Sequence, residues 1–239
     1  MEIKFHGHSC FELSDGSTTV LVDPFLKPNN PKAVATAEEV EPTHIAISHG
    51  HVDHMADAIP IAKRTGAHCV AVVEIANFLQ GHGVDEDNVS DPNLGGTVEF
   101  DWGWISLVPA WHTSTIAGSE EAPFSAEHGT PVGTAAGLLI NLGGKTVYHA
   151  GDTCLFSDMK LIAQRSPVDV AMLPIGGHYT MDRHDAVHAA EFVDAGTVIP
   201  MHYDTFPPIE TDAEEFKSEV ESKTSSKVVI LEAGETHTA

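Results

Sequence analysis

The chain has 239 residues, of which 35 are Asp or Glu and only 12 are Lys or Arg, so its formal net charge is −23 with neutral histidine. Nucleic acids and anionic membrane surfaces bind clustered cations, and the absence of any Lys/Arg-rich run disfavours both partners. Hydrophobic residues make up 42% of the chain, which is enough for a sizeable core in one domain or two fused halves.

Histidine is the most unusual component of the composition. There are 16 histidines, more than all lysines and arginines together, and imidazole is the commonest metal-binding side chain. The three cysteines include no Cys-x-x-Cys pair, which argues against a disulfide framework and a thiolate zinc site. The first residues lack the features of a secretion signal, and no window approaches 18 apolar residues, so we expect a cytoplasmic protein.

Short β-branched runs alternate with helical patterns, which predicts an α/β protein. Strands are expected at 3–12, 18–22, 44–48, 69–73, 97–100, 105–109, 136–141, 146–149, 168–173, 198–200 and 228–231. Helices are expected after the capping-box pattern at 36–39 and at 57–64, 156–164, 184–193 and 211–223. Segments 85–96 and 117–131 are the most loop-like. This periodicity permits an αββα sandwich or a doubly wound sheet.

The densest group of metal-binding residue types follows the strand expected at 44–48. The run His49-Gly50-His51-Val52-Asp53-His54 delivers three imidazoles and a carboxylate within six residues. Histidine and Asp fill a core poorly, whereas neutral imidazole and carboxylate suit Zn, Mn or Fe. The run therefore predicts a metal site.

The pattern His49-x-His51-x-Asp53-His54 resembles the signature of the metallo-β-lactamase superfamily. That resemblance implies a four-layer αββα sandwich of two similar halves and a site with two metal ions. It also implies three later motifs at strand ends: a histidine, a Gly-Asp pair and a last histidine. Residues that fit these motifs are His112, Gly151-Asp152 and His202.

The same resemblance implies a ligand for every metal position. His49, His51 and His112 would bind one ion, Asp53, His54 and His202 the other, and Asp152 would bridge them. The implied cofactors are two divalent ions, with zinc the first candidate and Mn or Fe left open. The 239 residues would form one metallo-hydrolase domain, with halves of roughly 1–117 and 118–239.

Two further segments narrow the resemblance. Gly7-His8-Ser9-Cys10-Phe11 and the run from Leu173 to Met181, which contains His178, resemble a small bacterial and archaeal branch of metal-dependent hydrolases. This UPF0173-like branch is similar to ascorbate-6-phosphate lactonases. The resemblance implies hydrolysis of an ester, lactone or phosphodiester in a small, anionic metabolite, and a homo-oligomeric assembly.

In two-metal hydrolysis the ions activate a bound water or hydroxide and polarise the group under attack. This chemistry suggests roles for residues near the implied ions. Asp53 would hold the nucleophile, while His178 and His8 would stabilise charge or protonate the leaving group. His8 could equally be a histidine bonded within the sheet. Asp23 either orients a ligand histidine or closes a turn.

Rival functions remain at this stage. A non-catalytic metal or small-ligand binding protein could use the same scaffold, although all seven ligand positions are filled, which favours an enzyme. An RNA nuclease is disfavoured by the net charge of −23. A flavin and di-iron protein would carry an acidic ligand at position 52, which is Val.

Overall fold

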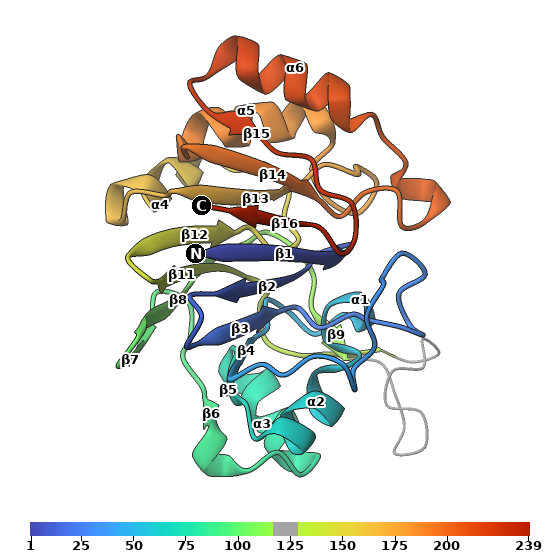
Figure 1. Ribbon diagram of the computed structural model, residues 1–239, viewed down its shortest axis with the longest axis vertical. Coiled ribbons are helices and arrows are strands. Elements are labelled where there is room, and N and C mark those ends of the chain that lie inside the picture. The colour runs from blue at the N-terminus through green and yellow to red at the C-terminus, as the bar shows by residue number, and fades with distance from the viewer. Residues whose placement is uncertain (117–128) are drawn as a thin grey trace.

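The computed structural model describes residues 1–116 and 129–239, which form two seven-stranded sheets and a small two-stranded ribbon (Figure 1). The first sheet has the order β16 (Thr236–Thr238), β1 (Glu2–Gly7), β2 (Cys10–Ser14), β3 (Thr19–Val22), β4 (His44–Ala46), β5 (His68–Val70) and β6 (Val89–Ser90). The second has the order β15 (Lys227–Val228), β14 (Thr197–Met201), β13 (Val170–Pro174), β12 (Lys145–His149), β11 (Ala136–Leu142), β8 (Gly103–Pro109) and β7 (Thr97–Phe100). The ribbon pairs β9 (Thr115–Ile116) with β10 (Thr130–Pro131).

Helices flank the sheets at both ends of the molecule, with α2 and α3 at the bottom of Figure 1 and α5 and α6 at the top. The α-helices are α1 (Val52–Met55), α2 (Ala58–Thr65), α3 (Val73–Gly81), α4 (Lys160–Arg165), α5 (Arg183–Val193) and α6 (Ala213–Lys223). Short 3-10 turns are η1 (Glu86–Asn88), η2 (Ser157–Met159) and η3 (Pro207–Ile209). A single apolar cluster joins residues of both sheets, such as Leu13, Ile45 and Leu139. This arrangement confirms the predicted four-layer αββα sandwich and excludes a single doubly wound sheet.

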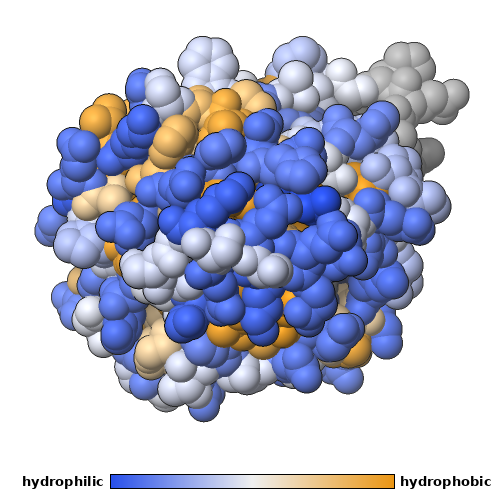
Figure 2. All heavy atoms as spheres, turned by 90° about the horizontal axis from the view of Figure 1, so that it is seen from above, coloured by the Kyte–Doolittle hydropathy of each residue, from blue (hydrophilic) through white to orange (hydrophobic). Residues whose placement is uncertain are grey.

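The surface agrees with the acidic composition. The face seen from above, on the side of α6, is mostly hydrophilic with scattered apolar side chains (Figure 2). In the described ranges, no helix has both the length and the apolar character needed to cross a membrane. The boundary expected near residues 117 and 118, and most of the loop expected at 117–131, lie outside the described residues.

Strand direction explains where functional side chains gather. β1 and β2, and β2 and β3, are antiparallel, and β3 to β6 are parallel, so β1, β3 and β4 all point the same way. By the same reasoning β8, β12, β13 and β14 share one direction in the second sheet. The loops that follow these strands carry the candidate metal ligands.

Backbone hydrogen bonds join the two sheets at this edge. The Ala136 amide at the start of β11 donates to the Ser48 carbonyl at 2.9 Å, and the His202 amide donates to the His8 carbonyl at 2.8 Å. These two bonds fix the position of loops of the first sheet relative to segments of the second. The seam between the sheets is therefore fixed at the point where the histidines converge.

Several predicted elements were wrong. The strand expected at 3–12 is a hairpin, because Gly7 (φ 107°) and His8 (φ 61°) turn the chain between β1 and β2. No helix follows Thr36: the Thr36 amide does donate to Glu39, but Pro42 follows closely and restricts the chain to a turn. The end of the strand expected at 69–73 instead begins α3, whose apolar Ile75, Ala76 and Leu79 have helical spacing.

Four short strands also escaped prediction. β6 lies in the loop expected at 85–96, β16 lies beyond the last predicted strand, and β9 and β10 form the two-stranded ribbon, with β10 in the loop expected at 117–131. Each is only two or three residues long, so no alternating pattern marks it. The remaining helices begin and end near their expected bounds, although the one expected at 156–164 divides into η2 and α4.

A side-chain hydrogen bond links the sheets away from the seam. Trp102 Nε1, in the turn between β7 and β8, donates to His44 Nε2 of β4 at 3.1 Å, which requires an unprotonated nitrogen. Burial, together with the nearby His68, lowers the pKa of His44 from 6.5 to about 4. A depressed histidine pKa contributes stability that is complete above pH 6.5 and is lost as the pH falls from 6.5 towards 4.

His44→Gln tests this contribution, because an amide oxygen can still accept from Trp102 but does not titrate. We expect the variant to lose less unfolding free energy than the wild type between pH 7 and pH 4.5, measured by urea denaturation at each pH. The exposed His188→Gln serves as the control and should follow the wild type. Parallel pH profiles for wild type and His44→Gln would contradict the prediction.

Glycines on either side of β12 provide a second test. Gly151 (φ 60°) precedes Asp152, and a Cβ there would lie 2.6 Å from the Ala136 carbonyl oxygen. Gly144 (φ 77°) at the other end of β12 has no atom within 4 Å of such a Cβ. We expect Gly151→Ala to destabilise the metal-free protein by about 2–4 kcal/mol and Gly144→Ala by only about 1 kcal/mol, measured by urea unfolding. Equal losses would show that the close contact at Gly151 relaxes without cost.

Candidate metal centre

The seven side chains implied as ligands converge from the loops that follow β4, β8, β12 and β14. His49 and His51 follow β4, Asp53 and His54 lie in α1, and His112, Asp152 and His202 follow β8, β12 and β14. The structure brings them together, with His8 as an eighth side chain, in two groups of four, each of which has ligand atoms within 4.8 Å of one another. One group is His49, His51, His112 and Asp152, and the other is His8, Asp53, His54 and His202.

The first group has the spacing of a metal shell. His51 Nδ1 lies 3.0 Å from His49 Nε2 and 3.3 Å from His112 Nε2, and Asp152 Oδ2 lies 3.5 Å from His112 Nε2. Atoms bound at about 2.1 Å to one tetrahedral zinc lie about 3.4 Å apart. The observed spacing fits one ion among these side chains.

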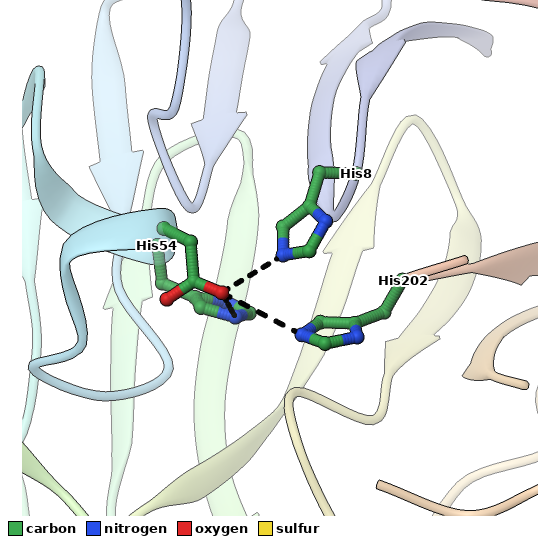
Figure 3. Close-up of side chains that lie close together, drawn as sticks. His8, His54 and His202 are labelled. Carbon is green, nitrogen blue, oxygen red and sulfur yellow. Dashed lines mark hydrogen bonds and ion pairs between the residues drawn. The ribbon is translucent and has the colours of Figure 1, made fainter. Parts of the chain in front are cut away.

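The second group faces the first across Asp152. Asp152 Oδ1 lies 3.3 Å from His54 Nε2, and Asp152 Oδ2 lies 3.1 Å from His202 Nε2. Asp152 therefore contacts side chains of both groups, which is the position expected of a bridging ligand. His202, which follows β14, and His8, in the turn after β1, point toward the same carboxylate, as Figure 3 shows. This carboxylate belongs to Asp53, whose Oδ2 lies 3.0 Å from His8 Nε2 and 3.7 Å from His202 Nε2.

Buried atoms without hydrogen bonds provide an independent test of fit. His54 Nε2, Asp152 Oδ1 and His202 Nε2 are buried and form no hydrogen bond, despite their short distances to neighbouring ligand candidates. Leaving such groups unsatisfied is costly, and a cation among them would satisfy all three. The donor set and its spacing therefore fit divalent metal ions, while the number and identity of the ions stay predictions.

Burial and mutual charge set the protonation of the metal-free site. Burial lowers the pKa of His49 well below its ordinary value and that of His8 to about 4. Burial alone would raise the pKa of Asp152, but the neighbouring His202 and His54 hold it well below its usual range. Asp152 is therefore an anion and His49 a neutral imidazole, the forms that bind metals.

Asp23, at the end of β3, orients histidines of both groups. Its Oδ2 accepts from Ser48 Oγ at 2.6 Å and lies 2.8 Å from His54 Nδ1, and its Oδ1 accepts from the Ser48 amide at 2.7 Å. Ser48 Oγ, whose proton points to Asp23, lies 2.9 Å from His49 Nδ1. Both histidines thus donate from Nδ1, which directs Nε2 toward the other candidate ligands. Of the two roles considered for Asp23, the contacts favour orientation of ligands.

His8 and His178 occupy different surroundings. His8 is buried in the hairpin turn and contacts Thr205 Oγ1 at 2.8 Å through Nδ1 as well as Asp53 through Nε2. His178 is exposed on the turn after β13, its ring packed edge-on against Tyr179. The structure gives His178 no contact with either ligand group among the described residues, so its catalytic role stays a prediction.

Backbone strain is concentrated around the site. His8, Asp23, His178 and His202 all have φ between 46° and 61°, in the left-handed region that non-glycine residues seldom adopt. Such conformations persist where surrounding contacts impose them, and they cluster at functional sites. The turn that carries His178 is tied to the same edge by a backbone hydrogen bond. In this bond the Met181 amide donates to the carbonyl of Thr153, the residue after Asp152.

A cavity of about 630 Å³ opens beside the ligands. Five of the predicted ligands line it, together with Phe25, Asn29, Val52, Thr113, Tyr179 and Phe206. Sequence reasoning missed these side chains and also Ser48 and Thr205. Only Ser48 carried a signal, its position directly before His49. By contrast His184 and His188 are exposed on α5, away from these ligands in the sequence and on a solvated helix face.

Comparisons with known proteins agree with this geometry. Residues 2–202 match a family model described as a beta-lactamase superfamily domain. A UPF0173 metal-dependent hydrolase of Methanopyrus kandleri is 47% identical over 99% of each chain, and one of Bacillus cereus is 44% identical over the full length of both. Igni18, a metallo hydrolase from the archaeon Ignicoccus hospitalis, shares 37% identity over 99% of this chain and 97% of its own, with a TM-score of 0.83.

Asp23→Asn tests the orienting role. Asn also tolerates the left-handed backbone, but its amide would present hydrogens to Ser48 Oγ and His54 Nδ1, which reverses the favoured tautomer of His54. We expect a roughly 10–100-fold loss of zinc affinity in competition with a chromogenic chelator. Asp15→Asn, at an exposed turn where Asp15 also accepts backbone hydrogen bonds, is the matched control. Unchanged zinc affinity in Asp23→Asn would refute the orienting role.

Proposed function

Because the chain belongs to the UPF0173 metal-dependent hydrolases of the beta-lactamase superfamily, we propose that it hydrolyses an ester, lactone or phosphodiester at a binuclear metal centre. The observation that carries the proposal is Asp152, a buried carboxylate placed between two groups of imidazoles whose ring nitrogens lie close to it. His49, His51 and His112 would hold one ion, and Asp53, His54 and His202 the other, with Asp152 shared. Bound divalent ions would supply an activated water and polarise the carbonyl or phosphoryl oxygen of the group under attack.

The chain's own residues position the reacting groups. Asp53 is only partly covered, unlike Asp152, and lines the cavity, so its carboxylate can hold the attacking water near the bound substrate. His8 holds Asp53 through Nε2 while Thr205 occupies its Nδ1. With both ring nitrogens engaged, His8 serves better as a positioning residue for Asp53 than as the proton donor to the leaving group.

The proton balance follows from hydrolysis itself. The oxygen of water bonds to the acyl carbon or to phosphorus, the bond to the leaving oxygen breaks, and a proton released by the attacking water must reach that leaving oxygen. His178, on its strained turn next to the cavity-lining Tyr179, is proposed to stabilise this developing charge. The family resemblance implies an anionic metabolite as substrate, but no Lys or Arg among the described residues that line the cavity supports this.

Metal removal and replacement of the bridging residue provide the decisive test. We expect the wild type to bind two ions per chain, to lose turnover of p-nitrophenyl esters or diesters after chelation, and to regain it with Zn or Mn. Asp152→Ala should lower turnover at saturating substrate by at least about 10³-fold and reduce the metal content. Elemental analysis and single-substrate kinetics measure both.

Asp158→Ala is the matched control, because Asp158 is an exposed carboxylate in η2, the next element after β12. This variant should behave as the wild type. Two bound ions without turnover of any ester, lactone or phosphodiester would instead favour a metal or small-ligand binding protein.

A further inference from the structure

The charged and titrating side chains that line the cavity belong to the candidate metal centre, apart from the phenol of Tyr179. The only charged residues of the cavity are the candidate ligands, of which Asp53 and Asp152 are acidic, and no Lys or Arg occurs among the described residues that line it. The rest of the wall consists of Phe25, Val52 and Phe206, with the short polar Asn29 and Thr113 and the phenol of Tyr179. A substrate group that extends away from the metal centre therefore meets rings and methyl groups.

From this wall we propose that the substrate is an ester or lactone whose substituent beyond the reacting carbonyl is an uncharged alkyl or aryl group. The inference rests on the proposed hydrolytic function and names its substrate class. A cavity of about 630 Å³ is of the size that encloses small organic molecules.

Two phenylalanines build the inner wall. Phe25 is buried, and its ring centroid lies 5.5 Å from that of His8 in an edge-to-face arrangement. The ring centroid of Phe206 lies 5.7 Å from that of the same imidazole, also edge-to-face. Both rings are held by their contact with a residue that itself contacts Asp53. A flat or branched apolar group beside the reacting carbonyl would pack against these rings and lose little by leaving water.

The mouth of the cavity is apolar as well. Among described residues the exposed large hydrophobic side chains are Val34, Val52, Trp111, Leu161 and Tyr179. Val52 and Tyr179 line the cavity, and Trp111, 67% exposed, directly precedes the candidate ligand His112. Exposed apolar side chains that line a cavity, as Val52 and Tyr179 do, are typical of a site that binds an apolar partner.

The lysines nearest in sequence to the residues that line the cavity do not line it themselves. Lys27 and Lys32 flank the lining residue Asn29, yet neither lines this cavity. Lys32 instead borders separate hollows together with Asp204 and Glu232. A carboxylate or phosphate on the remote part of a substrate would lose its hydration without gaining an ion pair. The net charge of −23 adds long-range repulsion of the same sign.

Matched substrates test the inference by kinetics. p-Nitrophenyl butyrate and p-nitrophenyl hemisuccinate share a leaving group and differ only in a terminal methyl or carboxylate. We expect kcat/KM to favour the butyrate by about 10²-fold after correction for their spontaneous hydrolysis. The ratio should persist in about 1 M salt, where charges are screened beyond about 3 Å, because the local wall and not the net charge causes it.

Matched ligands test the same wall without turnover. Butyrohydroxamate and succinate monohydroxamate present identical metal-binding groups with a methyl or a carboxylate tail. Calorimetric titration of the metal-loaded protein should show tighter binding of butyrohydroxamate by a similar factor. This preference would support the inferred cavity chemistry even if no ester were hydrolysed, so failure of the inference and failure of the proposed function are distinguishable.

A charge placed at the mouth should reverse the preference. Val52→Lys puts an ammonium group beside the cavity, and Val34→Lys changes another exposed valine that does not line it. We expect Val52→Lys to favour hemisuccinate and succinate monohydroxamate relative to the wild type, with its metal content verified, and Val34→Lys to keep the wild-type ratios. A wild-type preference for the anionic member of either pair, or a ratio that disappears in high salt, would overturn the inference.

Discussion

The desolvation of converging ligand atoms is the constraint on which the site depends. Asp152 is buried among imidazole nitrogens from three other loops, and three of the polar atoms involved form no hydrogen bond. Burial without partners is unfavourable for each of these atoms. Hydrogen bonds to Asp23 and Ser48 fix the ring orientation of His54 and His49, and Thr205 does the same for His8. These bonds keep the inner ring nitrogens directed into the site despite the cost of burying them. The site is thus organised for cations before any substrate enters.

Strand direction supplies the other half of the explanation. The ligand loops follow strands that run in a common direction within each sheet, so every such loop emerges at one edge. Packing two sheets face to face then brings the two sets of loops together, and the Ala136–Ser48 and His202–His8 backbone bonds register them. Ligands more than 150 positions apart in the sequence reach one another without any long excursion of the chain.

The sequence predicted which polar side chains converge at the candidate metal centre better than it predicted their surroundings. His49, Asp152 and His202 were recognisable because polar side chains end apolar runs, and two-sheet architecture followed from resemblance. Phe25 and Phe206 could not be singled out, since an apolar residue that lines a cavity has the same local pattern as one that fills a core. The turn at Gly7 and His8 was read as continuous strand because its tight geometry depends on φ, which residue type only partly specifies.

The pairing of β16 with β1 joins segments that are synthesised far apart in time. Residues 236–238, which cover the outer edge of β1, are translated more than 200 positions after it. Until then that edge presents free amide and carbonyl groups, the kind of surface that pairs with other nascent chains. His202 likewise reaches His8 only after most of the second sheet exists. The candidate ligands carried by the two sheets therefore come together only after most of both sheets has been translated.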